Sequence, residues 1–185
     1  GARPFLIAYN INLDSDDVEL AKRIARRVRE SGGGLARLQA NGFEVREPER
    51  GHPVRAQVSM NLLDFAVTPL WLVWESVAAL AAEDGVDLAE SELIGLAPLA
   101  AFLAVADHAG TDPDAAVEER LAAAAAALRL RAFSPLQALE LRLARESYRD
   151  AIGPAFTGYA DLLLRTADGV RDPAARRERL LEARA

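Results

Sequence analysis

The order of secondary-structure elements in the sequence predicts an α+β domain with an antiparallel sheet, followed by C-terminal helices. Residues 4–13 and 54–63 alternate apolar and polar side chains, as half-buried strands do. Two other stretches, starting near residues 15 and 69, repeat apolar side chains at helical spacing. Further strands between them give the order β-α-β-β-α-β. This is the ferredoxin-like pattern, in which the first and third strands are central and both helices cover one face of the sheet.

The first strand leads into a helix that begins with a cluster of polar residues. Ser15 is predicted to be the N-cap, and Asp16 and Asp17 suit the positive end of the helix dipole. Three consecutive glycines at residues 32–34 end this helix. Four arginines alternate with its apolar positions and indicate a solvated helix face: Arg23, Arg26, Arg27 and Arg29.

The middle of the chain is predicted to form two strands and a second helix. Residues 35–46 favour a strand that is interrupted at Asn41-Gly42, where a turn and a bulge fit equally well. A surface loop at residues 47–53 then leads to the third strand. Thr68 is predicted to cap the next helix, with Pro69 at its first position.

A short fourth strand, expected at residues 92–95, completes the core. The domain is expected to cover residues 1–145, with the ferredoxin-like core at 1–97 and a helical extension at 98–145. Residues 146–185 are expected to be a helical tail or a linker. Trp71 and Trp74 lie three positions apart on the second helix, which favours a place in the core or at an interface.

Polar side chains share one face of the two central strands. Gln57, Ser59 and Asn61 alternate with apolar residues in the third strand, and Asn10 and Asn12 lie near the end of the first. Because the helices cover only one face, these side chains are expected on the uncovered face. Strand patterning alone favours an ordinary solvated surface, and a recognition surface is the alternative.

Composition limits the possible functions. The formal charge of −6 and the pI of about 5.1 argue against a nucleic-acid binder, and the absence of cysteine excludes disulfides and thiolate chemistry. The two histidines are interpreted as structural, His52 as an exposed loop residue and His108 as a residue at a helix C-terminus. No apolar run is long enough for a membrane span, so a cytoplasmic location is the default expectation. The start at Gly1, without methionine, suggests a piece of a longer polypeptide.

Three blocks of sequence, in the same order, resemble the C-terminal subdomain of glutamate formiminotransferases. They are FLIAYNINL at residues 5–13, AQVSMNLLDF at 56–65 and SELIGLAPL at 91–99. A weaker fourth block is FSPLQALE at 133–140. The resemblance covers residues 1–145.

The resemblance implies a fold, an activity and a set of partners. In this family two similar ferredoxin-like subdomains face one another across a folate-binding passage, and the unit transfers a formimino group from N-formimino-L-glutamate to tetrahydrofolate in histidine breakdown. The catalytic histidine belongs to the N-terminal subdomain, so no catalytic residue is expected in this chain. The expected partners are folate, formiminoglutamate and the N-terminal subdomain, within a homodimer when the protein is intact.

The residues expected to bind substrate or folate are the polar side chains of the central strands and one arginine next to the family's folate-binding segment: Gln57, Ser59, Asn61, Asn10, Asn12 and Arg3. Tetrahydrofolate is expected as a co-substrate, and no metal is expected. The alternative hypothesis is a non-catalytic partner module whose polar sheet face docks on another subunit.

Overall fold

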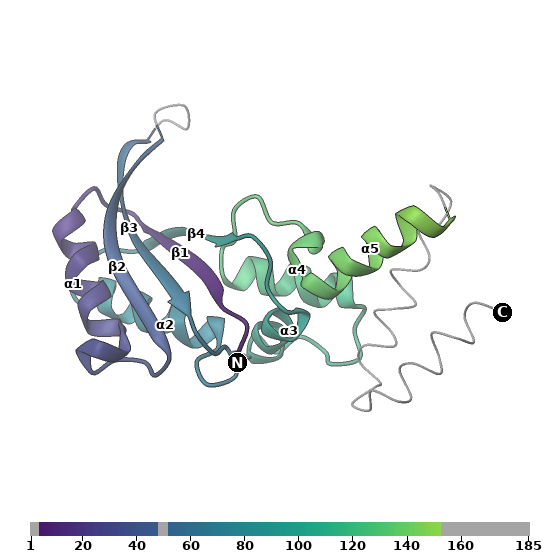
Figure 1. Cartoon of the computed structure of the whole chain (residues 1–185). Helices are drawn as coiled ribbons and strands as arrows, with labels where there is room; N and C mark the ends of the chain where they lie inside the picture. The colour runs from purple at the N-terminus through teal and green to yellow at the C-terminus, as the bar shows by residue number, and fades with distance from the viewer. Residues whose placement is uncertain (1–3, 48–51, 153–185) are drawn as a thin grey trace. The chain divides into compact units, whose positions relative to one another are not determined.

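The computed structural model describes residues 4–47 and 52–152, and it forms two compact units with a boundary after Ala138. The first unit is built on a four-stranded antiparallel sheet with the order β2-β3-β1-β4 (Figure 1). Its strands are β1 (Ile7–Leu13), β2 (Leu38–Glu47), β3 (His52–Leu62) and β4 (Leu88–Ile94). Helix α1 (Val18–Val28) follows β1, and helix α2 (Leu70–Ala82) follows β3. The predicted ferredoxin-like fold is confirmed.

The core lies between the sheet and these two helices. Alternate residues of β1 from Ile7 to Leu13 are fully buried, and their partners on β3 are the apolar residues Leu62, Met60 and Val58. Helix α1 buries a stripe of apolar side chains against β2 and β3. Burial raises the pKa of the Tyr9 phenol.

Gly42 permits a close crossing of α1 over β2, and the Asn41-Gly42 pair forms neither a turn nor a bulge. Strand β2 runs through it, and Gly42 pairs with Val58 in regular register. A Cβ atom built on Gly42 would lie 2.3 Å from the backbone nitrogen of Lys22. The glycine is therefore required by the helix that packs on the strand.

Both helices begin differently from the prediction. Asp17, two residues after Ser15, caps α1 by accepting a hydrogen bond from the backbone N–H of Leu20, while Ser15 accepts one from Asp17. Thr68 does not cap α2, since its buried hydroxyl donates to the carbonyl of Ala36. This bond ties the start of α2 to the approach to β2.

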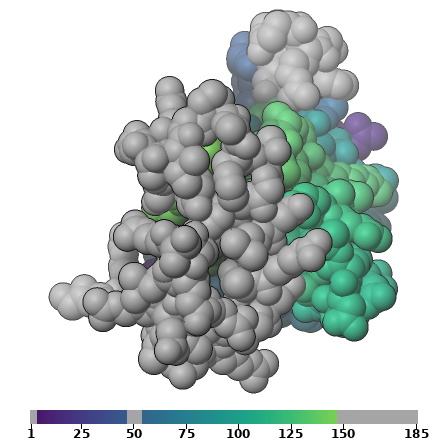
Figure 2. All heavy atoms as spheres, turned by 90° about the vertical axis from the view of Figure 1, so that its right-hand side faces the viewer, coloured from purple at the N-terminus to yellow at the C-terminus, as the bar shows by residue number. Residues whose placement is uncertain are grey.

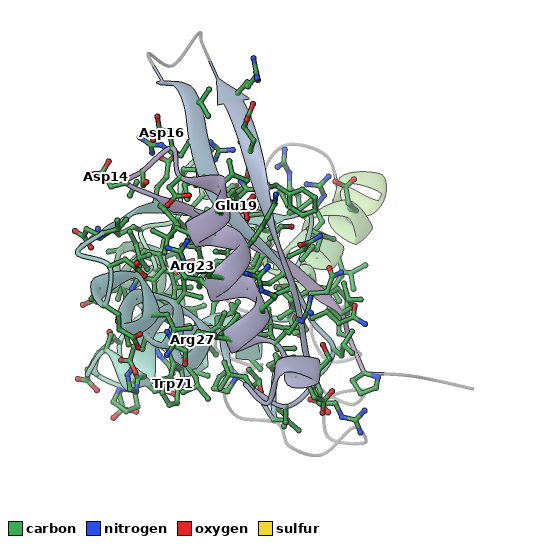
Figure 3. The ribbon with its side chains drawn as sticks, turned by 90° about the vertical axis from the view of Figure 1, so that its left-hand side faces the viewer. Asp14, Asp16, Glu19, Arg23, Arg27 and Trp71 are labelled. Carbon is green, nitrogen blue, oxygen red and sulfur yellow. The ribbon has the colours of Figure 1, made fainter. Side chains whose placement is uncertain are left out.

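A surface ion pair links α1 to the end of α2. Figure 3 shows Glu19, Arg23 and Arg27 following one another along α1. The Arg27 guanidinium contacts both oxygens of Glu83, at 2.5 and 2.9 Å, and Arg23 lies 3.2 Å from Asp84. This contact explains why the predicted solvated arginine face is only partly free.

We expect Arg27→Ala to return the carboxyl of Glu83 to its ordinary titration. The hydrogen bond from Arg27 lowers the pKa of Glu83, so the stabilisation is present above the unfolded-state pKa and is lost as pH falls through the folded-state value. NMR titration of the Glu83 side chain checks this, with Arg26→Ala as the control. An unchanged Glu83 titration in Arg27→Ala would contradict the pairing.

The chain after β4 adds helices and then returns to the sheet edge. Helices α3 (Leu99–His108) and α4 (Val117–Ala127) pack on each other, and Figure 2 shows the surface around them in teal and green. Residues 129–131 then run beside β4. The backbone N–H of Ser91 donates to the carbonyl of Arg129, and the backbone carbonyl of Ser91 accepts from the N–H of Arg131, both at 2.9 Å. This segment covers the outer edge of β4.

A capping box at Ser134 and Gln137 forms the short 3-10 helix Pro135–Gln137. The second unit contains α5 (Leu139–Ile152), which carries an ion pair between Arg142 and Glu146 at 3.5 Å. Within residues 4–47 and 52–152, no helix combines the length and the apolar character needed to span a bilayer.

Candidate functional site

The five predicted polar side chains of the central strands all lie on the sheet face opposite α1, here called the open face. Strand pairing aligns Asn12 with Gln57, Asn10 with Ser59, and Ala8 with Asn61. Residues paired directly across an antiparallel sheet point to the same face, so the two strands present one continuous polar surface. The prediction that these residues share a face is confirmed.

Neighbouring strands extend this surface into three rows. The closed row contains Phe43, Gln57, Asn12 and Glu90; the middle row contains Asn41, Ser59, Asn10 and Glu92; the end row contains Gln39, Asn61, Ala8 and Ile94. Each row crosses all four strands, from the free edge at β2 to the covered edge at β4.

The closed row is held together by side-chain hydrogen bonds. Nε2 of Gln57 donates to Oδ1 of Asn12 at 2.9 Å, and Nδ2 of Asn12 donates to Oε1 of Glu90 at 3.3 Å. Arg131 completes the chain, with contacts of 3.3 Å to Glu90 and 2.9 Å to Glu92. Asn12 and Gln57 are 1% and 6% exposed, so their polar groups are satisfied mainly by one another.

The carboxylate of Glu90 fixes the direction of every hydrogen bond in this row. An ionised carboxylate only accepts, so Asn12 must turn its amide nitrogen toward Glu90 and its oxygen toward Gln57. Gln57 must then donate to Asn12. This leaves Oε1 of Gln57 as an acceptor that, within the described residues, receives no hydrogen bond. A ligand group that meets Gln57 at this oxygen must be a donor.

The remaining predicted residues have free polar groups. Asn10, Ser59 and Asn61 are half-exposed, and their side chains make no hydrogen bond to the part of the chain that the structure describes. Ile94, opposite Ala8 in the end row, is 48% exposed and adds an apolar patch. Free amides beside an apolar patch suit a ligand with a flat ring and polar edges.

Arg3 lies outside the described residues. His108 is the last residue of α3, at a helix C-terminus as predicted, whereas the predicted loop position of His52 is wrong. His52 is the first residue of β3 and does not lie in a loop. The ring of His108 stacks on Trp71, with centroids 3.9 Å apart, and its Nε2 lies 2.7 Å from Oε1 of Glu75. Trp71 therefore packs at the surface, and neither histidine belongs to the three rows.

Sequence reasoning missed the charged residues of the closed and middle rows. Glu90 and Glu92 follow the same two-residue period as the predicted amides, but the fourth strand was expected to begin only at Glu92, whereas β4 begins at Leu88. Arg131 had no detectable signal, because it reaches β4 through a bridge between Ser91 and Leu130 in the segment after α4. Among the described residues, no group of three or more His, Asp or Glu side chains could hold a metal ion.

The fold and the three rows define a ferredoxin-like α+β domain whose sheet carries a polar open face. The model of the formiminotransferase domain matches residues 8–140, more than half of the chain. The chain therefore belongs to the formiminotransferase family.

Known relatives agree with this assignment. The chain is 39% identical over 108 residues to the glutamate formimidoyltransferases of Thermoplasma acidophilum and Streptococcus pyogenes serotype M1, which covers 58% of this chain and 34% of each relative. It is 44% identical over 113 residues to the formimidoyltransferase-cyclodeaminase of Gallus gallus, covering 58% of this chain and 20% of that protein. The chain thus matches about a third or less of the length of these relatives.

Proposed function

We propose that this chain is the C-terminal subdomain of the formiminotransferase unit of a glutamate formimidoyltransferase, and that its open face binds tetrahydrofolate and N-formimino-L-glutamate. The observation that carries the proposal is the set of free polar groups on Asn10, Ser59 and Asn61, on the open face of a domain that belongs to the formiminotransferase family. The domain is proposed to extend over residues 1–145, with residues 146–185 as a tail or linker.

The chemistry of the transfer suits this surface. A ring amine of the folate forms a bond to the formimino carbon, the bond from that carbon to the glutamate nitrogen breaks, and the proton lost by the folate amine is gained by glutamate. Such a two-substrate reaction depends on positioning, which uncharged amides provide because they both donate and accept. Oε1 of Gln57, fixed as an acceptor, suits an N–H of the formimino group or of the pterin.

The proposal assigns the two faces of the site to different parts of the protein. The proton-transferring histidine is supplied by a second, N-terminal subdomain, and the intact cytoplasmic enzyme is a homodimer that acts in histidine degradation. The open face of this chain then supplies the side chains that bind the substrates. Arg3 is proposed to bind folate as well, because it lies next to the family's folate-binding segment in the sequence.

We expect Asn61→Ala and Gln57→Ala each to weaken binding of tetrahydrofolate by roughly three- to tenfold, because each removes one hydrogen bond to the ligand. Isothermal titration calorimetry of the chain under anaerobic conditions measures the affinity. Ser59→Ala is expected to behave similarly, and Ser76→Ala, which removes a half-exposed hydroxyl from α2, serves as its matched control.

Unchanged affinity for tetrahydrofolate in both amide variants would contradict the proposal that the open face binds folate. Absence of folate binding by the wild-type chain, combined with stable association with a separate protein chain, would support the alternative of a non-catalytic partner module.

A further inference from the structure

A depression of about 290 Å³ lies at the free edge of the sheet, next to the end row. Arg29, Glu30 and Ser31 line it from the end of α1 and the short 3-10 helix Glu30–Gly32, and Leu38, Gln39 and Ala40 line it from β2. Gln39 belongs to both this depression and the end row, where it pairs with Asn61. The depression therefore borders the open face one strand away from Asn61, a spacing of about 4.8 Å.

Arg29 is a half-buried cation that lines the depression. Its Nε is enclosed and has no hydrogen-bond partner in the described part of the chain, and its guanidinium forms no ion pair there. Arg23 and Arg27, on the preceding helix α1, both contact carboxylates. Partial removal of a guanidinium from water is costly without an anion, and a ligand anion in the depression would offset that cost.

The other groups around the depression define the class of anion. The amide of Gln39 and the hydroxyl of Ser31 provide hydrogen-bond donors. The outer side of edge strand β2 carries backbone N–H groups that no other strand of the described residues pairs. The carboxylate of Glu30 lines the same space and repels a ligand that carries a high negative charge. One guanidinium fork beside one carboxylate suits a singly charged carboxylate better than a phosphate dianion.

We propose that Arg29 and Gln39 form a carboxylate subsite that receives the glutamate portion of a ligand bound on the open face. This inference rests on the proposed function for its choice of ligand. Two sources share this chemistry: the glutamate tail of a folate and the glutamate of N-formimino-L-glutamate.

The subsite is tested on the whole chain by following the Nε–Hε resonance of Arg29 by NMR during titration. Separate titrations with p-aminobenzoyl-L-glutamate and N-formimino-L-glutamate distinguish the two sources, and a tetrahydropterin without a glutamate tail is the negative control. We expect the Arg29 resonance to shift and saturate with at least one glutamate compound. The tailless pterin should leave it unmoved.

Two variants are expected to change the affinity in opposite directions, which a purely structural role of these residues would not produce. Arg29→Gln is expected to weaken binding of the glutamate compound by about ten- to hundredfold, since it removes a charge-assisted contact. Glu30→Gln is expected to strengthen binding, because it removes the opposing charge. Arg26→Gln, at an exposed position of helix α1, is the matched control and should leave affinity unchanged.

An Arg29→Gln chain that binds both glutamate compounds as tightly as wild type would overturn the subsite, as would an immobile Arg29 resonance at saturation. The outcome is separable from the proposed function. If tetrahydrofolate fails to bind, the proposed function is lost, while the Arg29 resonance still reports whether a carboxylate occupies the depression.

Discussion

Gly42→Ala is expected to destabilise the first unit by about 3 kcal/mol, the upper part of the range for overpacked sites. The added methyl group would lie 2.3 Å from the backbone nitrogen of Lys22 and 2.5 Å from the backbone carbon of Ala21. Both contacts are with helix backbone, so no side-chain rotation relieves them. Urea denaturation followed by circular dichroism measures the change in free energy of unfolding.

Gly85→Ala is the matched control for this experiment. Gly85 has a φ of +72°, and a Cβ atom built there would lie more than 4 Å from the surrounding atoms. Alanine at this position therefore costs only the left-handed backbone strain, about 1 kcal/mol. A loss in Gly42→Ala no larger than in this control would show that α1 lifts from β2 without cost. That result would contradict the close crossing.

Asn12→Asp is expected to cost about 3–5 kcal/mol at neutral pH, the range for an uncompensated buried charge. Asn12 is 1% exposed and donates to Glu90, so the substitution replaces a donor with a second carboxylate beside the first. Burial and the charge of Glu90 both raise the folded-state pKa of the introduced carboxyl. The folded variant then binds more protons than the unfolded one, so stability relative to wild type recovers as pH falls through that raised pKa.

Asn10→Asp provides the comparison, since Asn10 is one row away and half-exposed. Urea denaturation of the wild type and of both variants at several pH values isolates the difference caused by each substitution. A pH-independent loss in Asn12→Asp, or an equal loss in both variants, would mean that the hydrogen bonds of the closed row do not constrain Asn12 as the structure indicates.

The order of the elements was predictable because two strands and two helices have clear periodicity. The errors arose where a distant contact overrode a local signal. Asn41-Gly42 is a strong local indication of a turn, yet the approach of Lys22 requires a glycine inside a continuous strand. Thr68 has the chemistry of a helix cap, yet its hydroxyl bonds to Ala36, a residue far away in sequence.

The shared face of the polar residues was predictable from strand alternation, but their division into two groups was not. Asn12 and Gln57 are hydrogen-bonded to each other, and Asn12 also donates to Glu90, which contacts Arg131. The segment after α4 brings Arg131 to this position. Arg29 was likewise interpreted as one of four solvated arginines. Its enclosed Nε depends on how residues 29–31 pack beside β2, which periodicity does not describe.

The central strand β1 has no partner near it in the sequence. Ala8 pairs with Asn61 on one side and with Ile94 on the other, and every pair in both ladders joins residues at least 45 positions apart. Sheets built from such distant pairs fold slowly, because the intervening chain must be ordered before the contacts form. During synthesis, β1 is made before both of its partner strands, so its pairing is delayed until β3 and then β4 have left the ribosome.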